Sequence, residues 1–291
     1  MRIGFIGFGE VGSTLARDLQ AAAHASIAAF DIAFATAGSK ASRHAAEREV
    51  VVVGSAPDLA ARCDLVFHSV TAGSSLEAAK AAADGLRHAP WFVDVNSVSP
   101  GTKRATAEAV TAAGGRYVEA AVMASIPPKG IRTPVLLGGP HAEAFLPIAR
   151  DLGMAVEVFS AEVGGASSVK MCRSILIKGM EALLTEGMLT ARRYGVEKQV
   201  LASLTDTIDT DWSQLARYMM SRALVHGRRR AEEVREVVRT IEEAGLEPMQ
   251  SPATALRQDW AADRGLELTQ DVLATKDLAT LVDAVLAKAV K

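Results

Sequence analysis

Cysteine is scarce in this chain: among its 291 residues only Cys63 and Cys172 are cysteines. Two cysteines are too few for a disulfide framework or for a zinc site built on cysteine ligands. Carboxylates gather at Asp206, Asp209 and Asp211, but they lack the glycine and the terminal glutamate of a calcium-binding loop. We therefore expect a protein of a reducing compartment, with no metal site.

Long apolar runs and a strong net charge are also missing. No uninterrupted run of about 18 apolar residues occurs, which argues against a membrane span. The opening MRIGFIGFGEVG has no long apolar core, and its glycines come too early for a signal peptide. The formal net charge of -2 argues against a general nucleic-acid or membrane-surface binder, although residues 228–230 form a local basic patch. We expect a cytoplasmic protein with no nucleic-acid and no membrane partner.

Short apolar runs alternate with helix-like stretches in the first part of the chain. The predicted strands cover residues 3–6, 26–30, 49–53, 65–70, 91–95, 115–119, 135–137 and 156–159. Helical patterns over residues 11–22, 75–86 and 102–113 lie between them. Short buried strands separated by helices indicate a doubly wound, mostly parallel sheet with helices on both faces.

Strand signals stop after about Gly164. A helical pattern runs from Ser167 to Tyr194, which at about 1.5 Å per residue gives a helix of roughly 40 Å. Further helices are expected over residues 201–207, 211–224, 231–244 and 254–264. We predict an α/β domain over residues 1–162 and an all-helical substrate and dimerisation domain over residues 163–291, joined by the long helix.

The segment Gly7-Phe8-Gly9-Glu10-Val11-Gly12 fits the pattern G-x-G-x-x-G. It follows a predicted strand and opens a predicted helix, which is the context that a dinucleotide-binding loop requires. The first glycine permits a tight turn, the second lets backbone N–H groups approach a pyrophosphate, and the third allows the helix to pack closely on the sheet. The first domain is therefore expected to be a Rossmann domain.

Asp31 lies 19 residues after Gly12, at the end of the second predicted strand. A carboxylate at this place can accept hydrogen bonds from the ribose hydroxyl of NAD and would repel the 2′-phosphate of NADP. No arginine follows it directly, although Arg43 stands in the next loop. The expected cofactor is NAD, with NADP as the less favoured alternative.

Three later segments, taken with the glycine loop, are similar to one family. Residues 92–100 (FVDVNSVSP) look like a D-x-S-T-x-S-P segment, residues 134–139 (PVLLGG) like a late sheet strand, and residues 164–170 (GGASSVK) like the start of an interdomain helix. In this order they resemble the β-hydroxyacid dehydrogenases, which include 3-hydroxyisobutyrate dehydrogenase and the cofactor half of 6-phosphogluconate dehydrogenase. The resemblance covers nearly the whole chain and implies a dehydrogenase.

The resemblance places the family's catalytic lysine at Lys170. Oxidation of an alcohol requires removal of the hydroxyl proton while hydride leaves for the nicotinamide. A lysine desolvated in a cleft has a lowered pKa, so it can serve as base and, in the reverse direction, as acid. The alternative is a surface lysine in an exposed ion pair.

Two segments depart from the family's pattern. The asparagine usually found four residues after the lysine is Ser174 here, which can still donate a hydrogen bond to a substrate. Arg173, close to the same helix face, is a candidate for a substrate carboxylate or for an ion pair. Residues 119–125 (EAAVMAS) lack the family's paired glycines, and we take Met123 and Ser125 as substrate contacts. Substrate recognition is expected to differ, with a bulkier or less polar substrate.

Further site residues follow from position along the chain. Ser69 and Val70, at the end of a predicted strand, and Asn96, beyond the next, are expected to contact the cofactor. Ser97 is expected to contact the substrate. His226 stands where the family has a helix that approaches the active site, so it is a substrate candidate, with a capping or packed histidine as the alternative.

We predict an oxidoreductase that oxidises a β-hydroxy acid, or reduces the matching oxo acid, with Lys170 and Ser174 as its catalytic residues. Imine reduction is the second hypothesis, although imine reductases of this fold usually lack the lysine. The third is a protein that senses the dinucleotide without turnover. The apolar long helix and the resemblance both predict a homodimer or higher homo-oligomer.

Overall fold

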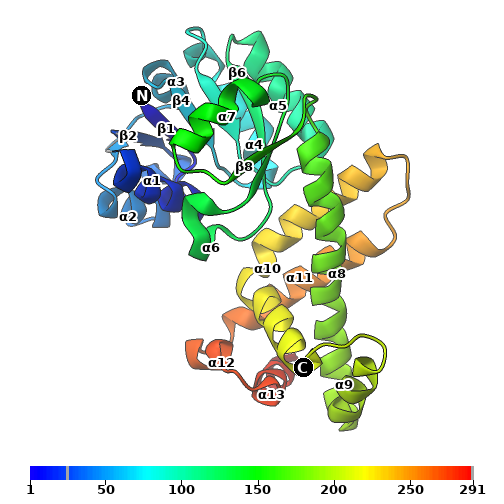
Figure 1. The fold of residues 1–291 in the computed structure, drawn as a ribbon. Coiled ribbons are helices and arrows are strands. Elements are labelled where there is room, and N and C mark those ends of the chain that lie inside the picture. The colour runs from blue at the N-terminus through cyan, green and yellow to red at the C-terminus, as the bar shows by residue number, and fades with distance from the viewer. Residues whose placement is uncertain (24–25, 290–291) are drawn as a thin grey trace. The chain divides into compact units, whose positions relative to one another are not determined.

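The computed structural model describes residues 1–23 and 26–289. The chain divides into two compact units, Met1–Met171 and Cys172–Lys291, and each is described by itself (Figure 1). The expected boundary between residues 162 and 163 lies just before the helix in which this division falls. The first unit holds the sheet and the second is helical, in agreement with the predicted fold class.

Eight strands form one sheet in the order β3-β2-β1-β4-β5-β6-β7-β8. Their bounds are β1 (Ile3–Ile6), β2 (Ile27–Phe30), β3 (Val51–Val52), β4 (Leu65–His68), β5 (Trp91–Asp94), β6 (Arg116–Val122), β7 (Val135–Gly138) and β8 (Val156–Ser160). All neighbouring strands are parallel except β6 and β7. Strand β6 is longer than expected because it pairs with β7 as far as Val122.

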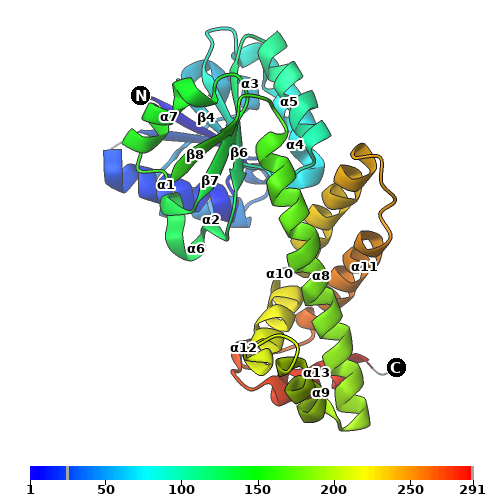
Figure 2. The same cartoon turned by 45° about the vertical axis from the view of Figure 1, so that its right-hand side comes forward.

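Helices cover both faces of this sheet (Figure 2). Helices α1 (Glu10–Ala23), α2 (Lys40–Glu47) and α7 (Ala142–Asp151) contribute to one hydrophobic core. Helices α3 (Ala56–Arg62), α4 (Ser75–Ala81) and α5 (Pro100–Ala112) contribute to the other. Strands β1, β4 and β5 are buried at every position because both faces are covered.

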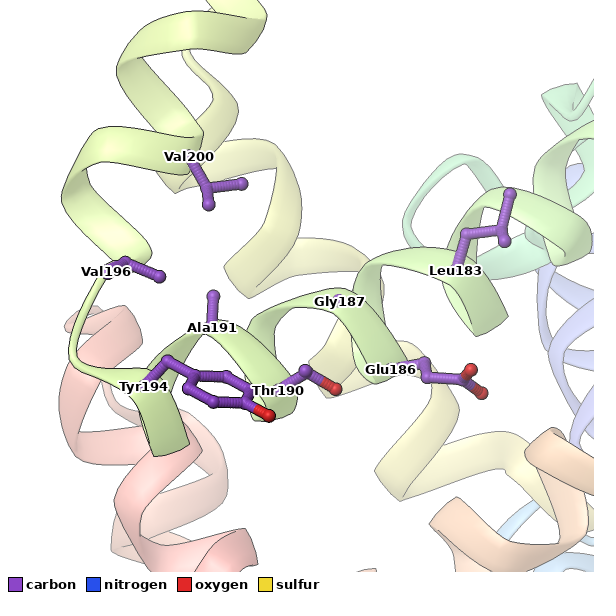
Figure 3. Close-up of a pocket in the computed structure, with 8 residues that line it drawn as sticks. All are labelled: Leu183, Glu186, Gly187, Thr190, Ala191, Tyr194, Val196 and Val200. Atoms are coloured by element: carbon purple, nitrogen blue, oxygen red, sulfur yellow. The ribbon is translucent and has the colours of Figure 1, made fainter.

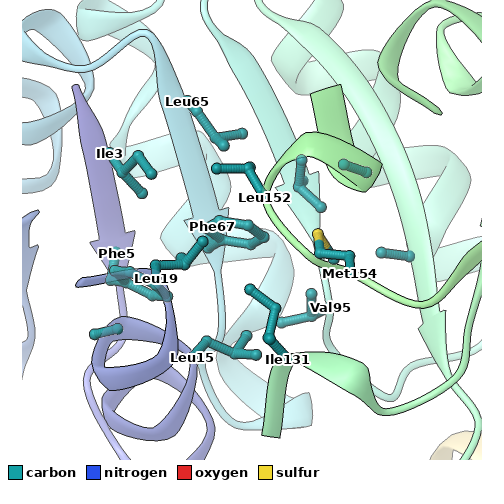
Figure 4. Close-up of a cluster of buried hydrophobic side chains, with 14 of the residues drawn as sticks. Ile3, Phe5, Leu15, Leu19, Leu65, Phe67, Val95, Ile131, Leu152 and Met154 are labelled. Atoms are coloured by element: carbon teal, nitrogen blue, oxygen red, sulfur yellow. The ribbon is translucent and has the colours of Figure 1, made fainter. Parts of the chain in front are cut away.

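The first core is built around stacked aromatic rings in the middle of the sheet (Figure 4). The rings of Phe5 and Phe67 lie 5.2 Å apart on neighbouring strands, with Leu15 and Leu19 of α1 close to them. Leu152 and Met154, which follow α7, complete the cluster. Because the strand ends are fixed by this packing, the loops that follow β1, β2, β4 and β5 project from one edge of the sheet.

The second unit consists of helices around a core of its own. Their bounds are α8 (Gly165–Tyr194), which begins in the first unit, α9 (Glu197–Thr205), α10 (Trp212–Glu243), α11 (Gln250–Leu266), α12 (Gln270–Ala274) and α13 (Leu278–Ala289). Trp212, Met220 and Leu281 are buried in this core. Among the described residues, no helix is long and apolar enough to cross a membrane.

The expected helices over residues 211–224 and 231–244 are one continuous helix, α10, so the predicted break between them is wrong. Gly227, which lies between the two expected helices, is buried against α11. A Cβ atom on Gly227 would lie 2.3 Å from the carbonyl oxygen of Gln258, and one on Gly265 would lie 2.1 Å from that of Leu224. These glycines therefore bring the two helix backbones into close contact and do not interrupt them.

We predict opposite effects for alanine at two helical glycines. Gly227→Ala is expected to lower the free energy of unfolding by about 2–4 kcal/mol, because the new methyl group meets backbone that cannot move aside. Gly179 of α8 has no atom within 4 Å of an added Cβ. Gly179→Ala should therefore raise stability by about 0.5–1 kcal/mol. Urea unfolding of both variants checks this, and equal effects at the two positions would contradict it.

Candidate active site

The three glycines of the first loop have the three different surroundings that the motif predicts. Gly7 has a φ of 89°, and a Cβ there would lie 2.4 Å from the carbonyl oxygen of Ser69. On Gly12, a Cβ would lie 2.6 Å from the carbonyl oxygen of Gly7. Around Gly9 there is no atom within 4 Å of that position. The chain is therefore packed at the first and third glycines and open at the second.

The open position at Gly9 coincides with the beginning of α1, where Glu10 and Val11 form the first turn. Ser13 donates its backbone N–H to the carbonyl oxygen of Gly9, so the N–H groups before it are left for a ligand. Helix N-termini with unpaired N–H groups favour phosphate oxygens. This geometry fits the pyrophosphate of a dinucleotide.

Asp31 connects the end of β2 to the glycine loop. One carboxylate oxygen accepts a hydrogen bond from the N–H of Phe8 at 2.7 Å, and the other accepts from the N–H of Ala33 at 2.8 Å. The second bond caps the short 3₁₀ helix η1 (Ile32–Ala35). A carboxylate has further lone pairs, so Asp31 retains the capacity to accept from a ribose hydroxyl. The sequence indicated the ribose role and missed the contact with Phe8.

Ser69 and Val70 lie against the glycine loop. The Ser69 hydroxyl donates to the carbonyl oxygen of Gly7 at 2.8 Å. A Val70 methyl group lies 2.8 Å from the position of an added Cβ on Gly7. Their shared effect is to fix the shape of the loop, which is consistent with their predicted place beside a cofactor.

Asn96 is 4% exposed and belongs to a buried polar network on the α4 and α5 side of the sheet. Its Nδ2 lies 2.9 Å from Nδ1 of His68, 2.8 Å from a carboxylate oxygen of Asp94 and 3.2 Å from the Ser75 hydroxyl. The Oδ1 atom of Asn96 has no partner within the described residues although it is buried. Such an acceptor fits a donor supplied by a bound cofactor.

Asp94 is the fully buried centre of this network. Its carboxylate accepts from the Tyr117 hydroxyl at 2.9 Å and lies 3.1 Å from Nζ of Lys103, which is also fully buried. Lys103 also donates to the Asp94 carbonyl oxygen at 2.8 Å. Burial, the largest single effect, raises the pKa of Asp94, but the Lys103 ammonium, the His68 ring and the N–H of Asn96 together outweigh it and hold that pKa below its ordinary value. Burial raises the pKa of Tyr117, and the neighbouring negative charges raise it further.

A second buried carboxylate, Glu119 of β6, fixes the beginning of α8. One of its oxygens accepts from the N–H of Gly164 at 2.8 Å and the other from the N–H of Ser167 at 2.7 Å. Gly138 provides the space, because a Cβ there would lie 2.5 Å from the Glu119 carboxylate. A negative charge at a helix N-terminus is favourable. Lys170 follows on the next turn of α8 and is half-buried, so its backbone position is set by the first unit.

The other predicted substrate contacts of the first unit differ in exposure. Ser97 and Met123 are half-buried, and the N–H of Met123 donates to the carbonyl oxygen of Pro134 at 2.9 Å. Ser125 is exposed and precedes the short helix α6 (Ile126–Lys129). Their roles toward a substrate stay predictions.

In the second unit, Ser174 and Arg173 face different surroundings. Ser174 is buried, and its hydroxyl lies 3.1 Å from Nζ of Lys178 one turn later. Arg173 is exposed, and His226 is half-buried on α10. The second unit thus places Ser174 beside a lysine that the sequence did not single out, and the roles of Arg173 and His226 stay predictions.

Among the residues that the structure describes, no group of His, Cys, Asp or Glu side chains is arranged to hold a metal ion. The buried residues His68, Lys103 and Glu119 are the site features that the sequence did not reveal. Their types are those of surface residues, and only the fold places them inside.

The fold and the glycine loop define the class of protein. Residues 2–147 match the family described as the NAD binding domain of 6-phosphogluconate dehydrogenase, and residues 191–261 match a domain of unknown function, DUF1932. The chain therefore belongs to the NAD-binding family of dehydrogenase-like proteins that this first domain defines. The predicted family and its Rossmann domain are confirmed.

Individual relatives agree with this placement. An uncharacterised 28.5 kDa protein of Methanothermus fervidus is 30% identical over 87% of this chain and 96% of its own length. A conserved hypothetical protein of Sinorhizobium meliloti has a solved structure with 34% identity and a TM-score of 0.74, covering 99% of this chain and 96% of that one. The 3-hydroxyisobutyrate dehydrogenase of Mycobacterium tuberculosis is 17% identical with a TM-score of 0.69, covering 98% and 99%, and shows the shared fold.

The same fold also occurs in an enzyme of different chemistry. An imine reductase of Streptomyces aurantiacus is 17% identical with a TM-score of 0.55, and the match covers all of both chains. The fold thus also occurs in an imine reductase, and the fold alone does not assign a reaction to this chain.

Lys103→Met removes the cation of the buried network and keeps the length of the side chain. The Asp94 carboxylate is then left without its countercharge, and we expect the free energy of unfolding at pH 7 to fall by about 3–5 kcal/mol. Lys80→Met, which breaks only the exposed pair with Glu77, is the control and should change stability by less than about 1 kcal/mol.

The loss in Lys103→Met should also depend on pH. In the wild type the pKa of Asp94 is lower in the folded than in the unfolded protein, so its contribution is present above about pH 4 and is lost as the pH falls. Without Lys103, burial raises that pKa above the unfolded value, so the variant loses stability as the pH rises through it. Urea unfolding at pH 5 and pH 8 should show a smaller deficit at pH 5; a deficit equal at both values would refute this account.

Proposed function

We propose that the protein is an NAD-dependent oxidoreductase that oxidises a β-hydroxy acid, or reduces the corresponding oxo acid, with Lys170 as the proton-transfer residue. The observation that carries the proposal is the cap made by Glu119, which fixes the first turn of α8 to the unit that holds the glycine loop. Lys170 is thereby held at a set place in the dinucleotide-binding unit. Membership of the family supports the same reaction class.

The chain's own residues supply binding and proton transfer. NAD, when bound, takes the hydride from the carbon that bears the hydroxyl group. The N–H groups beside Gly9 bind the pyrophosphate and the Oδ1 atom of Asn96 accepts from the cofactor. Lys170 takes the hydroxyl proton at Nζ during oxidation and returns it during reduction. The hydroxyls of Ser97 and Ser174 orient the substrate.

The cofactor preference follows from Asp31. Its carboxylate is held by two backbone N–H groups at the end of β2. A carboxylate fixed there accepts from the 2′-hydroxyl of NAD and repels the 2′-phosphate of NADP. We therefore propose NAD as the preferred cofactor.

The substrate is proposed to be a hydroxy or oxo acid that is bulkier or less polar than the family's usual one. Arg173 and His226 are the candidate contacts of the second unit, and Met123 and Ser125 those of the first. The segment with Met123 has no glycine that would expose backbone N–H groups to a carboxylate, so a side chain must take this role. A cytoplasmic location remains a prediction.

The test is a turnover assay with 2- and 3-hydroxy acids of graded size, followed by the absorbance of reduced nicotinamide, with NAD and NADP in parallel. Lys170→Ala should lower kcat by about 10²–10⁴-fold. Lys170→Arg should not restore kcat, because a guanidinium group stays protonated at neutral pH and cannot act as a base. Lys80→Ala is the matched surface control. NAD should give the higher kcat/KM with every acid that reacts.

Three outcomes of this assay contradict the proposal in different ways. Binding of NAD without turnover of any acid, carbonyl or imine would indicate a dinucleotide sensor. Reduction of imines alone would indicate an imine reductase. Turnover that survives Lys170→Ala would remove the lysine from the mechanism while keeping the oxidoreductase.

We also propose that the protein is a homodimer that uses the exposed side of α8. Leu176, Leu183 and Tyr194 are 67–79% exposed and fall on one stripe, since 18 residues make about five helical turns. Beside this stripe is a largely apolar pocket of about 440 Å³ (Figure 3). The pocket is lined by Leu183, Glu186, Gly187, Thr190, Ala191 and Tyr194 of α8 and by Val196 and Val200. A second copy of α8 would cover apolar side chains that a monomer leaves in water.

Light scattering after gel filtration gives the oligomeric mass directly. The wild type should elute as a dimer, and Leu183→Glu should shift it to a monomer because the charge would be buried in the contact. Leu266→Glu is the control, since Leu266 is 84% exposed on α11 and off the stripe. A monomeric wild type, or a dimer unaffected by Leu183→Glu, would exclude this interface.

A further inference from the structure

Lys178 is a buried cation whose two partners lie on different helices. Its Nζ lies 2.9 Å from a carboxylate oxygen of Glu233 on α10 and 3.1 Å from the hydroxyl of Ser174 on α8. The side chains of Lys178 and Glu233 are 8% and 12% exposed. The other carboxylate oxygen of Glu233 accepts from Arg229. The ammonium group of Lys178 is therefore held by Glu233, whose own position is fixed by Arg229.

The ammonium group determines how Ser174 can bond. An ammonium nitrogen has three donors and no acceptor, so the Ser174 oxygen must accept this hydrogen bond. The hydrogen of the Ser174 hydroxyl then points elsewhere. Over residues 1–23 and 26–289, that hydroxyl makes no second hydrogen bond. Ser174 is thus 5% exposed, and its hydroxyl accepts one hydrogen bond from Lys178 while its own hydrogen has no acceptor within the described residues.

Two other buried hydroxyls of the same unit behave differently. Thr185 donates to the carbonyl oxygen of Glu181 at 2.7 Å, and Thr240 donates to that of Glu236 at 2.8 Å. This bond to the carbonyl four residues earlier is the usual way for a helical hydroxyl to satisfy its hydrogen. Within the described residues Ser174 makes no such bond to a backbone carbonyl, so its hydrogen is available to a ligand oxygen.

A neighbouring cluster shows what a purely structural ion pair looks like in this unit. Glu181, one turn after Lys178, is fully buried and receives both guanidinium bonds of Arg230 and a bond of 2.8 Å from Gln258. This cluster already ties α8 to α10 and α11. Lys178 differs from this cluster because, besides its ion pair, it donates a hydrogen bond to the hydroxyl of Ser174.

We propose that Lys178, held by Glu233, is a positioning residue that directs the hydrogen of the Ser174 hydroxyl toward an oxygen of the substrate. The inference rests on the proposed function and deepens it, since it assigns the substrate an acceptor oxygen, of a carboxylate or of the reacting hydroxyl. The nearby ammonium polarises the Ser174 hydroxyl and so strengthens the bond that it donates. The spacing of 170, 174 and 178 places the reacting lysine and this pair along one side of α8.

The experiment compares Lys178→Met, Ser174→Ala and the double variant in the turnover assay with the best acid. Each single variant should lower kcat/KM by about 10- to 100-fold, the range expected for one hydrogen bond to a charged or polarised group. The double variant should be no worse than either single one, since both remove the same donated bond. Lys178→Arg should restore part of the activity, and the Kd for NAD should stay unchanged throughout.

Glu181→Gln is the matched structural control on the next turn of α8. It should lower the free energy of unfolding at least as much as Lys178→Met while leaving kcat/KM of the folded protein unchanged. Additive losses in the double variant, or full activity of Lys178→Met with Lys170→Ala inactive, would overturn the positioning role alone. A wild type with no turnover of any hydroxy acid would overturn the proposed function, and this inference with it.

Discussion

The candidate site depends on the two hydrogen bonds that the Glu119 carboxylate accepts from the N–H groups of Gly164 and Ser167. They join strand β6 to the first turn of α8, and a buried carboxylate at a helix N-terminus matches both the charge and the unpaired donors of that end. Only glycine at position 138 leaves room for this carboxylate, because a Cβ atom there would overlap it. Because the cap lies on the dinucleotide-binding unit, Lys170 keeps its register with the glycine loop.

The sheet also holds a pair of buried charges on the same side. Asp94 and Lys103 are both fully buried, at a cost in desolvation that only close pairing and added hydrogen bonds can offset. Tyr117 and Asn96 donate those hydrogen bonds to Asp94. The loop after β5 is therefore fixed by polar contacts, which are more directional than hydrophobic ones. A loop that must hold Asn96 at a set angle benefits from this directionality.

Features that depend on a local pattern could be predicted from the sequence. Features that depend on contacts between distant segments could not. The strand and helix periodicity, the glycine loop and Asp31 follow from spacing along the chain, and the structure places them as expected. The burial of Lys103, the cap made by Glu119 and the bond between Lys178 and Ser174 could not be predicted, because lysine and glutamate are surface residues unless a distant segment covers them. The continuity of α10 through residues 225–230 was missed because Gly227 serves a close helix contact, which depends on a distant segment.

Asp31 has a consequence for the kinetics of cofactor association. By accepting from the N–H of Phe8, it already gives the nucleotide-binding loop its shape in the ligand-free chain. The loop is preorganised, so a dinucleotide that arrives does not have to order it, and the entropic cost of binding is correspondingly small. Association should then be limited by diffusion and orientation and not by a conformational change in this loop. The carboxylate that we propose to select NAD would in this way also speed the association of the cofactor.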